Sequence, residues 1–152
     1  MYYLSKLPGV FYLISAKNQD KTIKLIMQCA LSKNSLFSIT RETDGTTSIL
    51  FRPQDQIEFE EILNSKSSDV LISPDRYYCF RLDTENPAIN EAGMLANVTT
   101  FLANSHIPIL CLSTYNCNYV YYPINNSDEM IEAIRSAPES FTLDMGDDST
   151  SD

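Results

Sequence analysis

Apolar residues in the first half of the chain follow two spacings, one typical of helices and one typical of strands. In residues 20–31 they recur at intervals of three and four, which places them on one face of a helix. Residues 55–63 predict a second, shorter helix with the same kind of face. Asp44-Gly45 tolerates the positive φ of a tight turn and predicts a hairpin. Runs rich in β-branched and aromatic residues predict strands over residues 10–16, 36–41, 46–52 and 70–72, the last closed by Pro74.

The second half of the chain repeats this arrangement of strands and helices. A helix is expected over residues 90–105, and another over residues 127–137 with Ser127 as its N-cap. In both segments the apolar residues again recur every third or fourth position. The expected strands cover residues 78–82, 107–114, 119–122 and, as a short edge strand, 141–143.

The order of elements therefore predicts two copies of the same supersecondary unit. The pattern of residues 36–63 also lines up with that of residues 109–134, strand on strand and helix on helix. We predict an α+β fold of two tandem ferredoxin-like βαββαβ units side by side, each an antiparallel sheet with helices on one face. Residues 1–74 form the first unit, residues 75–143 the second, and residues 144–152 a disordered acidic tail.

Charge and hydropathy exclude two broad classes of function. The chain has 152 residues, and 11 Lys and Arg oppose 20 Asp and Glu, for a net charge of −9. A protein that binds the phosphate backbone needs a basic face, so we expect no nucleic-acid partner. The apolar runs fall short of the roughly 18 residues that cross a membrane, so we expect no membrane partner and a cytoplasmic protein.

The residue types that carry enzyme chemistry are sparse. The four cysteines have no CxxC spacing, which favours reduced, mostly buried side chains over disulfides or a metal site. The single histidine, His106, lies at the end of a predicted helix, where an interaction with terminal carbonyl groups is the ordinary explanation. Neither a nucleophile motif nor a phosphate-binding glycine loop is present. We therefore expect no catalytic residue, no metal, no cofactor and no enzyme activity.

One stretch of the chain has the residue types of a ligand site. Residues 86–95 lead from a loop into the start of a predicted helix, where free N–H groups favour a carboxylate. Gly93 lets a ligand approach the backbone, and Glu91 can pair with an ammonium or guanidinium group. The hairpin at residues 113–118 adds hydroxyls, amides and the ring of Tyr115. Together these groups suit a zwitterionic amino acid, although each also has an ordinary structural explanation in helix ends and turns.

Three stretches of the chain resemble the ACT-domain family of amino-acid-binding regulatory modules. They are residues 36–42, the helix start at residues 91–94, and the strand and hairpin at residues 109–115. The Ser113-Thr114-Tyr115 step followed by Asn118 is the most specific match, and the likeness covers residues 8–137. Within the family the chain is most similar to CASTOR-type ACT proteins, the cytosolic arginine sensors of the TOR pathway, and to their small bacterial relatives.

The resemblance implies a tandem pair of ACT units, the first of them atypical, with the ligand held between ACT units. The animal sensors carry four units in one chain, so a chain with two implies that a homodimer completes the site. The family's hairpin ends in Asp, whereas Asn118 stands here, which weakens the case for a cationic ligand such as arginine. The ligand-binding residues carried over from the family are Ala88, Ile89, Asn90, Glu91, Gly93, Pro108, Ile109, Thr114, Tyr115, Asn116 and Asn118.

Three functions are open on this basis. The first is a non-enzymatic regulator that binds an amino acid, arginine or another polar one, and thereby changes its interaction with a regulatory protein partner. The second is a protein-interaction and dimerisation module that has lost ligand binding, because Asn118 removes a charge and Tyr115 or Ile89 fills the pocket. The third is an enzyme, which the missing motifs disfavour. We expect the first.

Overall fold

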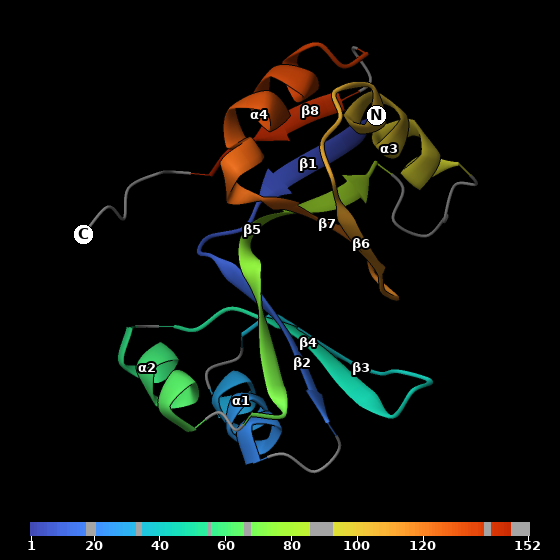
Figure 1. Ribbon diagram of the computed structural model, residues 1–152. Helices are drawn as coiled ribbons and strands as arrows, with labels where there is room; N and C mark the ends of the chain where they lie inside the picture. The colour runs from blue at the N-terminus through green and yellow to red at the C-terminus, as the bar shows by residue number, and fades with distance from the viewer. Residues whose placement is uncertain are drawn as a thin grey trace. The chain divides into compact units, whose positions relative to one another are not determined.

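The chain folds into two compact units, and the polypeptide passes from one to the other and back (Figure 1). We call Gly9–Arg76 the insert unit, and Met1–Pro8 together with Tyr77–Asp152 the terminal unit. The division expected after residue 74 differs from this one at the N-terminus, because the first residues pair with strands of the terminal unit. The computed structural model describes residues 1–17, 21–32, 35–54, 56–65, 68–85, 93–138 and 141–146.

The insert unit is a sheet with two helices. Its elements are β2 (Phe11–Lys17), α1 (Lys21–Ser32), β3 (Phe37–Arg41), β4 (Thr46–Phe51), α2 (Gln56–Ser65) and the first part of β5 (Val70–Thr84). The strands lie in the order β3-β4-β2-β5, and β4 pairs antiparallel with both β2 and β3. Ile26 of α1 and Ile62 of α2 are buried against Ile14 and Ile49 of the sheet. One apolar face on each helix and alternate strand residues therefore build this core, as the two spacings predict.

The terminal unit repeats this plan and adds a strand. Its elements are β1 (Tyr2–Lys6), the second part of β5, α3 (Met94–Asn104), β6 (Leu110–Ser113), β7 (Asn118–Pro123), α4 (Ser127–Arg135) and β8 (Phe141–Asp144). The strands lie in the order β6-β7-β5-β1-β8. Helices α3 and α4 pack side by side, and Val98, Leu102 and Met130 are buried against Phe80 and Val120. The succession β6-β7-α4 matches β3-β4-α2 of the insert unit, as the internal likeness predicts.

Strand β1 belongs to the terminal unit, although the insert unit separates it along the chain from the other strands of that unit. It pairs antiparallel with β5, Leu4 opposite Leu82, and parallel with β8, Leu4 opposite Leu143. Leu4 is 2% exposed and belongs to the core of this unit. The sequence predicts no strand here, because five residues with a single buried position carry no readable alternation. The insert unit therefore interrupts the terminal unit along the chain.

Strand β5 runs without a break through Pro74, where two separate strands are expected from the sequence. Its residues 70–76 belong to the insert unit and its residues 77–84 to the terminal unit. In the insert unit β5 is the outer strand of the order, beside β2. A sheet edge tolerates proline because the missing N–H is not needed by a partner strand. The predicted break at Pro74 is therefore wrong.

Several element ends also differ from the sequence-based expectations. Helix α3 begins at Met94 rather than at residue 90, because Gly93 has a φ of 87° and a helix cannot run through it. Strand β6 begins at Leu110, three residues later than expected. Helix α4 follows a 3-10 turn and has Asn126 as its N-cap, so Ser127 is its first residue rather than its cap. The short edge strand is confirmed as β8; residues 147–152 of the predicted tail lie outside the described residues.

The four cysteines differ in their burial. Cys79 and Cys117 are buried, Cys29 is partly buried and Cys111 is exposed. Cys111 is the exception to the mostly buried cysteines that the sequence predicts, because β6 is an edge strand of its sheet. Burial raises the pKa of the Cys79 thiol to about 12, which keeps this thiol protonated near neutral pH. None of the helices in the described ranges is long and apolar enough to cross a membrane.

The place of β1 in the terminal core predicts the effect of truncating Leu4. We expect Leu4→Ala to lower the free energy of unfolding by about 2–5 kcal/mol, since it removes a buried side chain and leaves a cavity. Leu71→Ala is the matched control, because Leu71 is 69% exposed and surface substitutions cost about 0.5 kcal/mol or less. Urea denaturation of both variants measures the difference. Equal midpoints for the two would contradict a structural role for β1.

Candidate ligand-binding site

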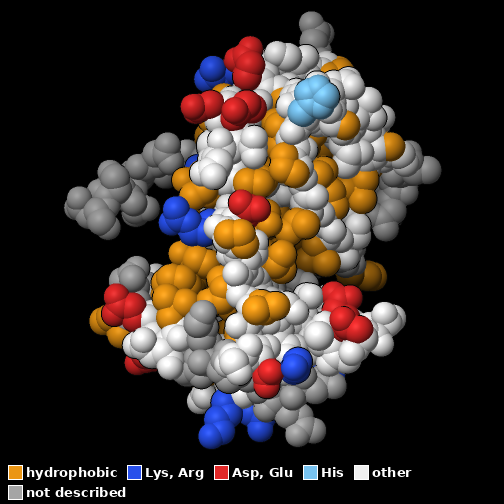
Figure 2. Space-filling view, in the orientation of Figure 1, with side chains coloured by type: hydrophobic (Ala, Val, Ile, Leu, Met, Phe, Trp, Pro, Cys, Tyr) orange, Lys and Arg blue, Asp and Glu red, His pale blue; other side chains and the backbone are white. Residues whose placement is uncertain are grey.

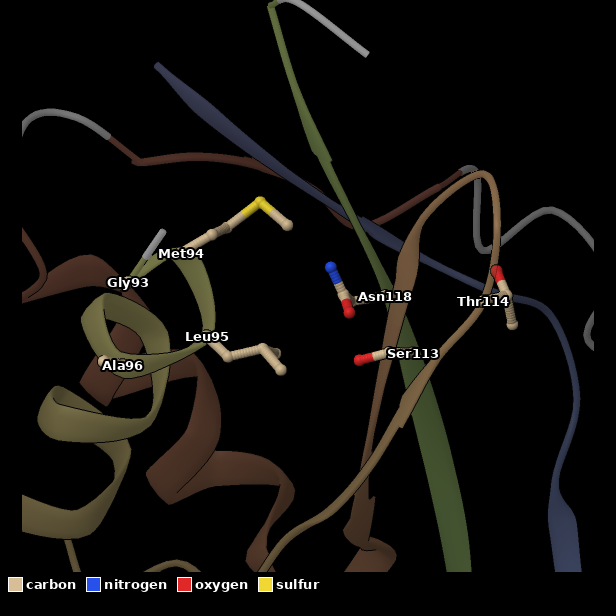
Figure 3. Close-up of a pocket in the computed structure, with 7 residues that line it drawn as sticks. All are labelled: Gly93, Met94, Leu95, Ala96, Ser113, Thr114 and Asn118. Carbon is tan, nitrogen blue, oxygen red and sulfur yellow. The ribbon is translucent and has the colours of Figure 1, made fainter. Parts of the chain in front are cut away.

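The terminal unit contains a pocket of about 400 Å³ between the start of helix α3 and the β6–β7 hairpin (Figure 3). This volume is at the small end of the range of ligand-binding cavities. The wall on the helix side consists of consecutive residues of the helix start, and the wall on the hairpin side consists of polar residues. The described residues that line it are Gly93, Met94, Leu95, Ala96, Ser113, Thr114 and Asn118.

The helix wall presents backbone N–H groups. Gly93 is the N-cap of α3 and gives no side-chain hydrogen bond, while the N–H of Asn97 donates to the carbonyl oxygen of Gly93 at 2.9 Å. The N–H groups of Met94, Leu95 and Ala96 precede the first intrahelical bond, so no helix carbonyl accepts from them. No other acceptor for them is found among the described residues. With the positive end of the helix dipole, these three groups favour an anion.

Gly93 is required by backbone conformation rather than by crowding. Its φ of 87° lies in the left-handed region that side chains other than glycine rarely adopt. A Cβ placed on it would meet no atom within 4 Å among the described residues. The alternative that this glycine only allows close helix packing therefore has no support. The space in front of it is open and belongs to the pocket.

The hairpin wall is closed by Thr114. Its N–H and its Oγ1 hydroxyl both donate to the carbonyl oxygen of Cys117, each at 2.9 Å. The N–H of Cys117 donates back to Oγ1 of Thr114 at 3.4 Å. These bonds hold residues 114–117 in a tight turn, so the hydroxyl of Thr114 serves the hairpin itself. Ser113 and Asn118, one on each side of the turn, are left to face the pocket.

Asn118 is the most unusual residue of the pocket. The residue is 6% exposed as a whole, but its amide nitrogen and oxygen are not among the buried unpaired side-chain atoms of the described residues. Figure 3 shows this amide between the start of α3 and strand β6, with the hydroxyl of Ser113 beside it. Ser113 and Asn118 are opposite each other in the β6–β7 ladder. An amide in this position can both donate to and accept from a bound molecule.

The pocket is neutral at the described positions. None of the seven lining side chains carries a charge, and the described residues hold no cluster of His, Cys, Asp and Glu able to bind a metal ion. Beside the hairpin, a hydrogen bond with Cys117 and burial raise the pKa of Tyr119 to about 12, so this phenol is also neutral. The helix dipole is therefore the main source of electric field among these groups.

The structure brings together three of the residues predicted from the sequence and separates others. Gly93, Thr114 and Asn118 line the pocket. Tyr115 is 99% exposed and Asn116 is exposed at the turn, so Tyr115 does not fill the pocket as the interaction-module alternative supposes. The remaining predictions fall elsewhere: Pro108 is exposed and Ile109 packs on the core, outside this lining, while Ala88, Ile89, Asn90 and Glu91 lie outside the described residues.

Four lining residues were not among the predicted contacts. Met94, Leu95 and Ala96 contribute backbone N–H groups, and the only signal for them was the position of the helix start. The sequence predicts that start at residue 90, four residues before the first residue of α3. Ser113 was noted as part of the hairpin, but only the strand register places it opposite Asn118. A role for all these residues in binding stays a prediction.

A second hollow of about 620 Å³ lies between α3 and α4, and its polar groups differ in kind. Asp128, Glu129 and Glu132 line it, and all three are exposed. Acidic side chains gather over this end of the terminal unit in Figure 2. Exposed carboxylates are solvated and need no ligand.

His106, with a φ of 56°, is exposed at the C-terminal end of α3, where a left-handed residue ends a helix.

Comparison with known proteins adds information on the fold. No family model matches the sequence, and no curated protein matches it. Protein Atu0741 of Agobacterium tumefaciens has a TM-score of 0.68 at 19% identity, over 95% of each chain. The regulatory subunit of aspartate kinase from Thermus thermophilus has a TM-score of 0.61 at 11% identity, over 90% of this chain and 96% of that one. Aspartate kinase of Clostridium acetobutylicum, an allosteric enzyme, has a TM-score of 0.58 at 12% identity, over 88% of this chain and 33% of the enzyme.

The fold is ACT-like. The predicted α+β class, with ferredoxin-like units of antiparallel sheet and helices, is confirmed. At identities of 11–19% these likenesses concern the fold alone.

The closed turn predicts a specific effect of removing the Thr114 hydroxyl. We expect Thr114→Val to lower the free energy of unfolding by about 1–2 kcal/mol, because the carbonyl of Cys117 loses a hydrogen bond. Thr114→Ser keeps the hydroxyl and is the matched control. Hydrogen exchange at the amides of Thr114 and Cys117 should accelerate in the valine variant only. Unchanged exchange in that variant would show that the hydroxyl does not close the turn.

Proposed function

We propose that this protein is a non-enzymatic regulatory protein that binds an amino acid in the pocket at the start of α3. The observation that carries the proposal is the pair of facing walls, with helix N–H groups that find no acceptor among the described residues on one side and the amide of Asn118 on the other. An amino acid has a carboxylate that suits the first wall and further polar groups that suit the second. The ACT-like fold, which it shares with regulatory subunits of aspartate kinase, supports this proposal.

In the proposed complex, the carboxylate of the ligand accepts hydrogen bonds from the N–H groups of Met94, Leu95 and Ala96. The helix dipole strengthens these bonds, and bonds to a charged acceptor are stronger than bonds between neutral groups. The hydroxyl of Ser113 and the amide of Asn118 meet the polar groups at the other end of the ligand. The hydrogen bonds to the two walls are the source of the proposed affinity.

The resemblance to CASTOR-type proteins supports a finer version of the proposal. In this version the protein is a cytoplasmic nutrient sensor of the TOR-signalling type, and the ligand changes its affinity for a regulatory protein partner. Such a change requires only that the ligand bind one conformation more tightly than another. Arginine and other polar amino acids are the candidates on this basis.

Ligand-induced stabilisation tests the proposal directly. A ligand that binds only the native state stabilises it by RT ln(1 + [L]/Kd), which is about 2.7 kcal/mol at a hundredfold excess over Kd. We therefore expect at least one of the twenty amino acids, at millimolar concentration, to raise the melting temperature by several degrees. If none of them does so, the proposed function is wrong.

A variant of the helix start locates the binding. Ala96→Pro removes one of the three free N–H groups in the first turn, where proline is tolerated because no intrahelical bond is lost. We expect it to weaken ligand binding at least tenfold, whereas the control Ala96→Ser keeps the N–H and the affinity. Isothermal titration measures both, and the melting temperatures without ligand show that both variants fold. Equal affinities would place the ligand elsewhere.

The finer version also includes a homodimer. Ser113 and Thr114 line the pocket but are exposed in the single chain, so a second copy over this face would exclude water from the ligand. We expect light scattering to give twice the monomer mass at micromolar concentration, with the proportion of dimer rising when the ligand is added. A monomer at all concentrations, with and without ligand, would limit the site to one chain.

A further inference from the structure

We propose that the outward face of helices α1 and α2 is a contact surface for a second copy of this chain. The proposal goes beyond the proposed function and does not rest on it, because these helices belong to the insert unit and the pocket belongs to the terminal unit. We call this surface the helix face. It consists of exposed residues only, namely Lys24, Met27, Gln28 and Leu31 of α1 and Ile57, Glu60, Glu61 and Asn64 of α2.

The helix face exposes three large apolar side chains. Leu31 is 68% exposed, Ile57 is 71% exposed and Met27 is 37% exposed. Isolated apolar side chains are common on protein surfaces, whereas a group of them on neighbouring elements is typical of an interface. Helices α1 and α2 pack side by side over the core of the insert unit (Figure 1). The three side chains therefore lie on one surface.

The terminal unit provides an internal comparison, because it repeats the plan of two helices on a sheet. None of the large apolar side chains that are exposed within the described ranges lies on α3 or α4. A unit of this kind can therefore cover its sheet with helices that keep their large apolar side chains inward. The fold by itself does not account for the exposure on α1 and α2, whereas burial against another molecule does.

Both helices present exposed residues with the same spacing. On α1 they occupy positions i, i+3, i+4 and i+7 counted from Lys24, and on α2 the same positions counted from Ile57. This spacing marks one side of a helix, opposite the side that holds Ile26 and Ile62 in the core. The stripe on α1 begins with a cation and ends with Leu31. The stripe on α2 begins with an apolar residue and continues with two acids.

The directions of the two helices bring similar residues to the same end of the helix face. Strands β2 and β4 are antiparallel, and α1 follows β2 as α2 follows β4. Because each helix runs back along the sheet after its strand, α1 and α2 run in opposite directions. Leu31 at the end of α1 and Ile57 at the start of α2 thus share one end. Lys24 and Glu61 lie toward the other end, which carries charges of both signs.

This arrangement is complementary to itself about one kind of two-fold axis. An axis parallel to the helices places α1 of each copy on α2 of the other, in the opposite direction, with one apolar end on the other. An axis across the helices would place the apolar end on the charged end instead. The charges therefore agree with the apolar residues in selecting the same packing.

The spacing along the helices allows both kinds of contact at once. With Leu31 over Ile57 of the second copy, Lys24 lies about 10 Å further along α1 and Glu61 about 6 Å further along α2, at a rise of about 1.5 Å per residue. A lysine side chain spans the difference. By symmetry each contact occurs twice. The helix face thus supplies both halves of the match, which favours a second copy over a different protein as its partner.

A charge placed at the apolar end tests the contact. Leu31→Glu would bury a carboxylate against Ile57 of the second copy, so we expect the dissociation constant for self-association to rise at least tenfold. Light scattering of the full chain at one micromolar concentration, without ligand, should give the variant half the mass of the wild-type protein. Leu71→Glu is the matched control, because Leu71 is 69% exposed in the same unit but lies on β5. We expect it to keep the wild-type mass.

The masses decide the proposal in either direction. Equal masses for the wild-type protein and Leu31→Glu would overturn it, whether both are monomers or both are larger. An equal loss of mass in Leu71→Glu would overturn it as well. If circular dichroism shows that Leu31→Glu does not fold, Ile57→Glu makes the corresponding change on α2 and has the same expected result. Amino-acid binding in the pocket should be unchanged in these variants, so this proposal and the proposed function can fail separately.

An exchange of charges tests the orientation of the two copies. Lys24→Glu alone and Glu61→Lys alone each place like charges opposite one another, and we expect each to weaken self-association about threefold or more. The double variant restores opposite charges across the contact and should return the dissociation constant to near the wild-type value. Added salt should reduce these differences. A double variant weaker than both single variants would overturn the packing of α1 on α2 of the second copy.

Discussion

The register of β7 between β5 and β6 is the constraint on which the candidate site depends. Asn118 lies opposite Leu82 on one side and Ser113 on the other. Successive side chains of a strand point to opposite faces, so Asn118 shares a face with Val120 and Tyr122, which are buried in the core beneath α3 and α4. A slip of one residue would turn Asn118 to the opposite face and place Tyr119 toward the helices. The same face of β7 therefore supplies Val120 and Tyr122 to the core and Asn118 to the pocket at the start of α3.

The two walls of the pocket share an energetic property. Each presents polar groups that the described part of the chain does not pair, three N–H groups on α3 and the amide of Asn118 on β7. By contrast, the hydroxyl of Thr114 is fully used within its own turn. The division between groups that hold the structure and groups left for a ligand is what distinguishes this pocket from the acidic hollow between α3 and α4.

The interrupted order of the terminal unit links the N-terminus to the site. The side-chain amide of Asn97, on the first turns of α3, donates to the hydroxyl of Tyr2 on β1 at 2.9 Å. The ring of Tyr2 stacks on Phe141 of β8 with centroids 5.0 Å apart, and Phe141 meets Phe101 of α3 edge to face. The helix whose start forms one pocket wall is thus held by the first and the last strands of the described chain.

The sequence by itself determined the class of the fold, because spacings of two and of three to four residues are local consequences of strand and helix geometry. It also located the hairpin at residues 113–118, since turn chemistry depends on a few adjacent residues. It did not predict β1, the passage of β5 through Pro74, or the start of α3 at Met94. Only the tertiary structure decided these features, together with the pairing of Ser113 with Asn118 and the burial of Asn118. Each depends on which distant strands become neighbours, and that choice is made by packing across the whole core rather than by any local pattern.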